Sequence, residues 1–590
     1  QANAAFTQGN LQGAERICLA ELKKNPQSPD ILHLLALISK ESGRFLRSLE
    51  FFDLSLEVSP RQPVVWSNKA NLLRLLGRVE EADECYEQSV RLMPAFRDAW
   101  QNRGALELDR DCPERAVRWF EKAQKIEANV ASTTSLIESY LSLGSYDKAS
   151  QLLVRMKKKW VGDLSLLVGE VRLLMARGQY AKAILSLEQA LKTHPNKGFI
   201  CYQLGLVYLA ESKISEASKW LEQAVSVSPD LIDAHRVLNN IYRESDDPRF
   251  LLSYAEAITK LPRYAPLYHN LAAAYLSVDE VDVAGECLSK AVEEIGRNPY
   301  LVHGLGVYWL RLGELNKAAP LLKESLVKLP DNVRFLIDNA NINLKLEDYK
   351  KADGLLSHAQ LVEPNNQEIW AYYSVLWRLT DTDRYEWLNQ YEEFIRQVEL
   401  PFNESSEGYL ETLKTYLVGL HTTSKEPLDQ SVRNGTQSLD NLWRHESPIV
   451  DKFRQSLDQS IRSYIGALKK DDSHPFLKRI KESYRISGAW SVRLNNGGFH
   501  SNHVHPRGWL SCCTYVSLPE TVRDSDTTQD GWIKFGETSL GLGTREKIAY
   551  AIKPREGVCV FFPSFFWHGT NSFSSVSPRL TIPIDIDPDS

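Results

Sequence analysis

The chain has 590 residues, of which 43% are hydrophobic and 25% are charged, and its formal net charge is −6 at pH 7. This is the composition of a globular protein, and the length is too great for one hydrophobic core. The acidic balance argues against nucleic acid or an anionic membrane surface as a partner, and no apolar run is long enough to span a bilayer. The eight cysteines include no Cys-x-x-Cys pair, so we expect reduced thiols and a cytoplasmic protein.

A thirty-four-residue period runs through the first 380 residues. Prolines mark it in three groups: Pro26, Pro60 and Pro94; Pro195 and Pro229; Pro330 and Pro364. Leu204-Gly205 and Leu305-Gly306 add alternating large and small residues, which let paired helices pack closely. The pattern resembles the tetratricopeptide repeat family. The resemblance implies about eleven repeats over residues 1–380, stacked as an all-α superhelical solenoid with a concave groove for a protein or peptide.

Residues 381–480 lose the register, and we expect capping and connecting helices with a polar loop there. The crowded aromatics that begin at Trp370 are interpreted as a terminal repeat that packs on the next domain. The polar stretch Ser431–Gln437 contains Arg and Gln, and it either lines the mouth of that domain or braces it. Both interpretations remain open at this point. A helix is predicted from about Pro448 to Lys469.

Residues 481–590 consist of short β-branched and aromatic runs separated by Gly, Pro and Asn, which predict strands such as Tyr484 to Asn495. If His503 and His505 lie on a strand, they point to the same face. His568 follows an aromatic run and is itself followed by glycine. Three imidazoles from two segments suit a borderline metal such as Fe(II) and leave coordination positions open for substrate.

Several motifs in this region carry a second resemblance. They are Gly-Gly-x-His, His-x-His-Pro, Leu-Ser-x-x-x-Tyr-Val, Phe-Phe-Pro-Ser-x-x-x-His-Gly and an Arg-x-Thr pair at Arg579 and Thr581. The segment resembles Fe(II)- and 2-oxoglutarate-dependent oxygenases, especially a bacterial His-x-His subgroup often fused to tetratricopeptide repeats. The resemblance implies a double-stranded β-helix of the jelly-roll or cupin type over residues 481–590, with Fe(II) and 2-oxoglutarate as cofactors.

The same resemblance assigns roles to individual residues. It makes His503, His505 and His568 the catalytic metal ligands. It places Arg579 and Thr581 on the far carboxylate of 2-oxoglutarate, where a planar guanidinium binds a carboxylate with two hydrogen bonds. Thr514 and Tyr515 complete the expected cofactor-binding residues, all of which the resemblance supplies.

The chain departs from the family pattern at two positions. His505 stands where an Asp or Glu is usual, and Glu537 is the nearest carboxylate that could replace it, although its spacing does not favour it. Thr514 stands where relatives often have a tyrosine that touches the cosubstrate. We favour three histidine ligands.

We therefore predict a dioxygenase, a hydroxylase of a protein or peptide held in the repeat groove. Two alternatives remain at this stage. One is a repeat scaffold with an inactive barrel, and the other is a three-histidine, cupin-like dioxygenase that does not use 2-oxoglutarate.

Overall fold

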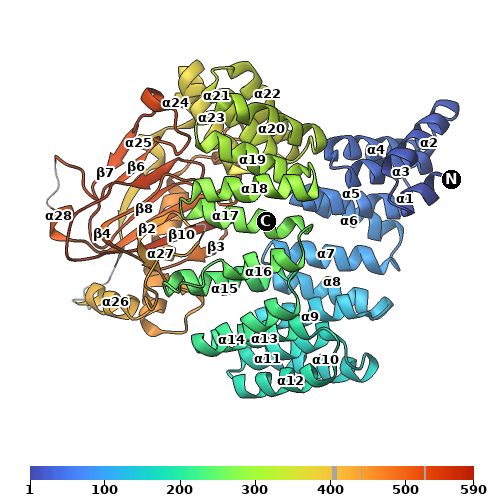
Figure 1. Cartoon of the computed structure of the whole chain (residues 1–590), viewed down its shortest axis with the longest axis horizontal. Helices are drawn as coiled ribbons and strands as arrows, with labels where there is room; N and C mark the ends of the chain where they lie inside the picture. The colour runs from blue at the N-terminus through green and yellow to red at the C-terminus, as the bar shows by residue number, and fades with distance from the viewer. Residues whose placement is uncertain (402–407, 429, 440, 524–526, 590) are drawn as a thin grey trace.

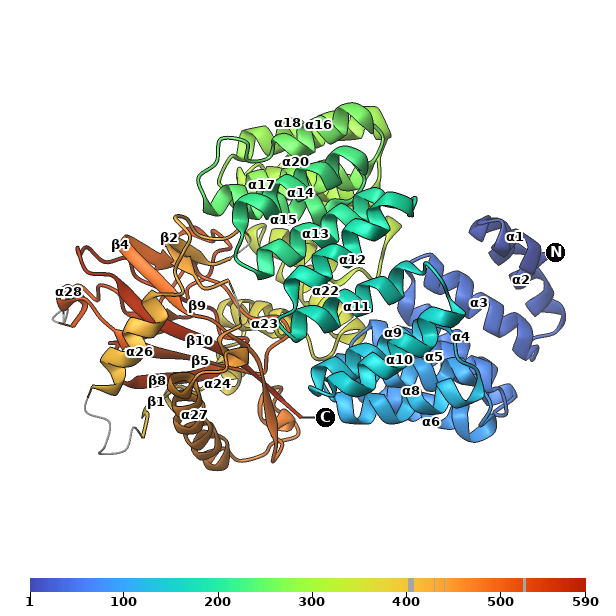
Figure 2. The ribbon, with the colours of Figure 1, turned by 90° about the horizontal axis from the view of Figure 1, so that it is seen from below.

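A helical solenoid curves around a β domain (Figure 1). The computed structural model describes residues 1–401, 408–428, 430–439, 441–523 and 527–589. The solenoid runs from the N-terminus to about residue 380, and the β domain occupies the C-terminal part. In both orientations the C-terminus lies on the side of the β domain that faces the solenoid (Figures 1 and 2).

Eleven consecutive helix pairs build the solenoid within the described residues, followed by one more helix, α23 (Gln367–Thr380). The first six pairs are α1 (Ala2–Thr7) and α2 (Leu11–Lys24), α3 (Pro29–Glu41) and α4 (Phe45–Val58), α5 (Pro63–Leu75) and α6 (Val79–Leu92), α7 (Arg97–Asp109) and α8 (Pro113–Ile126), α9 (Val130–Ser142) and α10 (Tyr146–Lys159), and α11 (Leu164–Ala176) and α12 (Tyr180–Thr193). The others are α13 (Lys197–Ala210) and α14 (Ile214–Val227), α15 (Ile232–Glu244) and α16 (Leu252–Lys260), α17 (Ala265–Ser277) and α18 (Val281–Ile295), α19 (Pro299–Arg311) and α20 (Leu315–Lys328), and α21 (Val333–Lys345) and α22 (Tyr349–Val362).

Small residues bring the two helices of a pair together, as the sequence predicts. A Cβ added to Gly306 would lie 2.8 Å from Cδ2 of Leu322, too close for any side chain. Gly205 has the same relationship to Leu221. The solenoid is irregular near residue 250. There α16 is only 9 residues long and follows Leu251, whose φ is 65°.

The solenoid curls far enough for early and late repeats to touch. The backbone N–H of Leu46, in α4, donates a hydrogen bond to Oδ2 of Asp331 at 2.8 Å, across 285 residues of sequence. The other carboxylate oxygen of Asp331 lies 2.6 Å from Nε2 of His358 in α22. The contact between Leu46 and Asp331 closes the curve of the solenoid and holds α4 against the segment that precedes α21.

Two antiparallel sheets form the β domain. In the described residues its strands are β1 (Arg396–Glu399), β2 (Val432–Gln437), β3 (Tyr484–Ala489), β4 (Val492–His500), β5 (Leu510–Ser517), β6 (Ile533–Phe535), β7 (Tyr550–Ile552), β8 (Val558–Pro563), β9 (His568–Thr570) and β10 (Arg579–Pro588). The larger sheet has the order β1-β8-β5-β10-β4-β2, with β3 also paired to β10, and the smaller has the order β7-β6-β9. Rings from the two sheets meet where Phe535 contacts Phe562, with centroids 5.1 Å apart. This is the jelly-roll arrangement.

The remaining helices connect and cover this domain. They are α24 (Thr382–Leu388), α25 (Tyr391–Phe394), α26 (Tyr409–Val418), α27 (Pro448–Ala467) and α28 (Glu520–Arg523), with the 3-10 turns η2 (Leu442–Arg444), η3 (Leu477–Arg479) and η4 (Gly543–Arg545). Helix α27 lies on the outer face of the large sheet, where Tyr464 stacks on Phe561 with centroids 5.1 Å apart. The opposite face of that sheet therefore looks into the domain.

The structure differs from the sequence-based expectations in three local details. The segment 381–480 supplies two strands of the large sheet, β1 and β2, and not only helices and a loop. The strand expected from Tyr484 to Asn495 is broken at Ser491, which exchanges hydrogen bonds with Ser438. His503 and His505 lie in a loop after β4, where only His503 makes a bridge, so the strand alternation invoked for them does not apply.

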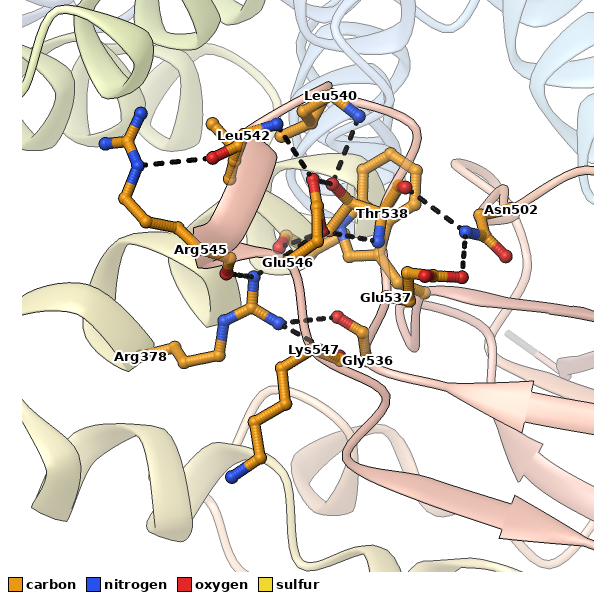
Figure 3. A network of polar contacts seen from close by, with 12 residues as sticks. Arg378, Asn502, Gly536, Glu537, Thr538, Leu540, Leu542, Arg545, Glu546 and Lys547 are labelled. Atoms are coloured by element: carbon orange, nitrogen blue, oxygen red, sulfur yellow. Dashed lines mark hydrogen bonds and ion pairs between the residues drawn. The ribbon is translucent and has the colours of Figure 1, made fainter.

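Helix α23 joins the solenoid to the β domain. The indole N–H of Trp567 donates to the carbonyl of Ala371 at 3.1 Å, and the backbone N–H of Gln367 donates to Pro506 at 2.8 Å. Arg378 donates to the carbonyl of Gly536 at 2.7 Å (Figure 3). Since Trp567 and Pro506 each adjoin a predicted ligand, the end of the solenoid is braced directly against the candidate site.

Candidate metal and cosubstrate site

Three histidines meet at one point of the β domain. One ring nitrogen each from His503, His505 and His568 lies within 4.8 Å of the other two. The backbone brings two of them together, since His503 and His568 exchange N–H···O=C hydrogen bonds of 2.9 and 3.0 Å. Within the described residues this is the one cluster of histidine, cysteine or carboxylate side chains that could hold a metal ion.

All three rings use the same nitrogen to bind the protein. Nδ1 of His503 lies 2.8 Å from the carbonyl of Ser501, and Nδ1 of His568 lies 2.9 Å from that of Phe566. Carbonyl oxygens only accept hydrogen bonds, so these Nδ1 atoms carry the protons and the Nε2 atoms keep a lone pair. Metal-binding histidines are oriented by this kind of outer contact.

The third ring is held by a carboxylate. Nδ1 of His505 lies 2.9 Å from Oδ2 of Asp585 on β10, and the other oxygen of Asp585 accepts a hydrogen bond from Ser511 at 2.9 Å. Sequence reasoning missed Asp585. The acidic group usual among the ligands is thus present behind His505, where it can raise the basicity of the imidazole.

Burial favours the neutral form of two of the three rings, whereas Asp585 favours protonation of the third. Burial lowers the pKa of His503 to about 3, and the neighbouring His505 adds to this effect. Burial likewise lowers the pKa of His568 well below its ordinary value. For His505, burial also opposes protonation, but the charge and hydrogen bond of Asp585 outweigh burial and raise its pKa. Neutral imidazoles are the form that binds a metal.

Arg579 lies in the same cavity as the three histidines. It begins β10, is only 1% exposed, and stands over the ring of Tyr515 with Cζ 5.1 Å from the centroid. Its Nε and Nη1 atoms have no hydrogen-bond partner among the described residues. A buried guanidinium with free donors costs free energy unless a ligand supplies acceptors.

Strand register separates the other predicted cosubstrate residues. Thr581 is opposite Tyr515 in the β5–β10 pairing, so both lie on the inner face, as does Asp585 opposite Ser511. Thr514 is opposite Ile582 and therefore points to the other face of the sheet, the one that α27 covers. The structure does not bring Thr514 to the cavity, because adjacent residues of a strand face opposite sides.

Glu537 is not among the candidate ligands. Its carboxylate pairs with the ammonium of Lys534 and accepts a hydrogen bond from Nδ2 of Asn502 at 2.9 Å (Figure 3). Because those contacts engage the Glu537 carboxylate, the three-histidine set stands without it.

The cavity has a volume of about 1340 Å³ and reaches from Arg579, past the histidines, to the solenoid. Both ends of the Ser431–Gln437 stretch line it, and the same stretch, as β2, pairs with β4. The Ser431–Gln437 stretch therefore both lines the cavity and braces the large sheet. His500 also lines the cavity, with Nδ1 3.0 Å from Oγ of Ser431 and its ring centroid 6.2 Å from that of His503.

The residues present fit a divalent iron centre. Three imidazoles that contact the protein through Nδ1 can present Nε2 as nitrogen ligands of the kind Fe(II) accepts, and the open cavity leaves room for further ligands. The cationic, unpaired Arg579 in the same cavity fits the far carboxylate of a dicarboxylic acid.

The fold and this site define a repeat solenoid joined to a jelly-roll domain with a histidine metal centre. Comparison with known families agrees. Residues 488–585 match the family described as "Putative 2OG-Fe(II) oxygenase", and residues 64–96 and 174–241 match tetratricopeptide repeat families. The chain thus carries tetratricopeptide repeats followed by a C-terminal domain of the 2OG-Fe(II) oxygenase type.

The curated relatives match over part of their length. Human "Protein O-mannosyl-transferase TMTC3" is 28% identical over 221 residues, which is 35% of this chain and 23% of that protein. The "BBSome complex member BBS4 homolog" of Drosophila melanogaster is 22% identical over 292 residues, 49% of this chain and 55% of its own. The chain therefore spans only about a quarter and a half, respectively, of these two relatives.

Solved structures similar to the chain include a tetratricopeptide repeat protein from Parabacteroides merdae, 20% identical, with a TM-score of 0.35. It covers 40% of this chain and 94% of its own. "YrrB: a TPR protein with an unusual peptide-binding site" is 21% identical, with a TM-score of 0.24, and covers 31% of this chain and 95% of its own. In the described part of the chain, no helix combines the length and apolarity needed to cross a membrane.

Proposed function

We propose that the protein is an Fe(II)- and 2-oxoglutarate-dependent dioxygenase of the cytoplasm that hydroxylates a polypeptide. Nε2 atoms of His503, His505 and His568 would hold the iron. When bound, iron and 2-oxoglutarate would supply O₂-dependent oxidising chemistry, in which one atom of O₂ enters succinate as 2-oxoglutarate loses CO₂ and the other enters the substrate as a hydroxyl group. The protein's own residues orient the reactants and shape the space around them.

Arg579 is the observation that carries this proposal. A three-histidine centre alone would suit several metal enzymes, but a fully buried guanidinium with two free donors in the same cavity calls for a carboxylate ligand. Thr581, on the same face of β10 as Arg579, would add a hydroxyl contact. These features support 2-oxoglutarate as the cosubstrate.

The size of the cavity supports a large substrate. Its volume of about 1340 Å³ exceeds the roughly 300–1000 Å³ of typical small-molecule sites, and solenoid residues form part of its wall. A polypeptide held by the repeats could insert one side chain toward the histidines.

A second candidate keeps the three histidines but not the cosubstrate. It is a cupin-like dioxygenase that does not use 2-oxoglutarate, and the absence of a carboxylate from the ligand cluster favours it. Incubation of the full chain with Fe(II) and 2-oxoglutarate in air separates the candidates. Succinate formation that depends on Fe(II) supports our proposal. Bound iron without succinate supports the second candidate, and failure to bind iron supports an inactive scaffold.

A further inference from the structure

The mouth of the cavity contains polar groups that the site described above does not use. The inner face of β10 continues outward from Asp585 to Asp587, which is 9% exposed and lines the cavity. Oδ2 of Asp587 lies 3.6 Å from the Arg485 guanidinium, whereas its Oδ1 is buried and has no hydrogen-bond partner among the described residues. A buried carboxylate oxygen in that state needs a donor.

The opposite side of the mouth comes from the solenoid. An Nη1 donor of Arg485 binds the carbonyl of Arg110, which follows α7, across 375 residues of sequence. Arg110 is 7% exposed and also lines the cavity. The Nε atoms of Arg485 and Arg110 are both buried and lack partners in the described structure. Two free donors and one free acceptor therefore meet where solenoid and β domain join.

Cations outnumber acids around this mouth. Besides Arg579 deeper in the cavity, four lining side chains make no ion pair with any described residue: Lys478, Arg479, Lys481 and Arg507. Among the described lining acids, Glu80 and Asp589 also make no ion pair. The other lining acids are paired, for example Asp109 with Arg74 and Asp472 with Lys470. Burial lowers the pKa of Lys478, and the adjacent Arg479 adds to this effect.

We propose that Asp587, Arg485 and Arg110 form a substrate subsite, built jointly by the solenoid and the β domain, for an extended acidic polypeptide segment. The free Oδ1 would accept a backbone N–H of that segment, and the free guanidinium donors would bind its carbonyls. The surrounding cations would bind its Asp or Glu side chains. Nucleic acid fits less well, because a phosphodiester backbone has no donor for the Asp587 oxygen. This inference rests on the proposed function and names its substrate class.

The subsite can be tested on the full chain with Mn(II) and 2-oxoglutarate bound and oxygen excluded. A displayed library of random dodecapeptides is selected on the parent protein. We expect enriched peptides to contain more Asp and Glu than the input library. Their Kd should rise about tenfold or more for Asp587→Asn and Arg485→Gln, as loss of a charge-assisted hydrogen bond predicts. Lys481→Glu and Arg507→Glu, at two exposed sites, should weaken the same peptides without a folding defect.

Asp247→Asn and Arg249→Gln are the matched controls, since they form a 2.8 Å ion pair that does not line the cavity. They should leave peptide binding unchanged. The proposal is overturned if enriched peptides are not acidic, if they bind all variants equally, or if an oligothymidylate displaces them at equal affinity. Metal and 2-oxoglutarate affinities are measured on the same samples. If the parent binds neither, the proposed function has failed; if it binds both but selects no peptide, only the subsite has failed.

Discussion

Asp585 and His505 are 80 residues apart in sequence, yet Oδ2 of the carboxylate lies 2.9 Å from Nδ1 of the imidazole. The Asp585 side chain is 19% exposed, and its position on β10 places it against the Nδ1 side of His505. In the proposed site, a histidine thus takes the place of the usual acidic ligand, and an acid supports that histidine from outside the cluster.

Removing this support should weaken metal binding. We expect Asp585→Ala to raise the Kd for Mn(II) about 10- to 100-fold, because the imidazole loses both its charge partner and its orientation. Asp585→Asn keeps an acceptor for the Nδ1 proton, so its effect should be smaller. Competition with a fluorescent chelator measures both values. An Ala variant that binds Mn(II) as tightly as the parent would contradict the supporting role of Asp585, and an Asn variant weaker than the Ala variant would contradict the role of the hydrogen-bond acceptor.

Arg579 should control cosubstrate affinity and not metal affinity. Loss of two charge-assisted hydrogen bonds in Arg579→Gln should raise the Kd for 2-oxoglutarate roughly 100-fold, with Mn(II) affinity changed less than threefold. Arg493→Gln is the control, because Arg493 pairs with Leu580 and therefore faces the other side of the sheet. Calorimetric titration that gave equal 2-oxoglutarate affinity for Arg579→Gln and the parent would exclude the role.

Two buried threonines on neighbouring strands should behave differently. Thr581→Val should weaken 2-oxoglutarate about fivefold to tenfold, since the hydroxyl lies on the inner face with Tyr515. Thr514→Val should leave the affinity unchanged, because Thr514 lies beside Ile582 on the opposite face of the sheet and does not line the cavity. Equal losses in the two variants would show that strand register does not decide which threonine meets the cosubstrate.

The solenoid should lose stability in mild acid around His235. This ring is 0% exposed, it contacts Ser253 and the carbonyl of Pro229, and burial lowers its pKa to about 4. Its folded pKa lies below its unfolded one, so its contribution is present above pH 6.5 and is lost as pH falls toward 4. By pH 5 the loss should be about 2 kcal/mol. Hydrogen-exchange protection of α15, corrected for intrinsic rates, should fall accordingly between pH 7 and 5. In His235→Gln this pH dependence should largely disappear.

The solenoid was predictable because its signal is local and repeated. Each repeat carries its own proline and small-residue positions, such as Gly306 against Leu322, so a single sequence states the pattern many times. The metal cluster was predictable for a related reason. His503 and His505 are two residues apart in sequence, and His568 follows a recognisable aromatic run.

The other features depend on contacts that no local pattern reports. Asp585 differs from Asp587 only by its place along β10, and its role follows from register with Ser511. The solenoid closes through a hydrogen bond between Leu46 and Asp331, and nothing in the sequence around either residue predicts that contact. Strands β1 and β2 are short and polar, so their sequences predict connecting segments. Only their pairing with β8 and β4 shows that they are strands.

The central claim is that three imidazoles and Arg579 place iron and 2-oxoglutarate together in one cavity. Anaerobic titration of the Fe(II)-loaded protein with 2-oxoglutarate tests it most directly, because chelation of Fe(II) by a 2-oxo acid gives a visible charge-transfer absorption band. The account predicts a saturable band in the parent, a higher midpoint in Arg579→Gln, and no band in His568→Ala. Iron that stays bound in the parent without producing this band at saturating 2-oxoglutarate would contradict it.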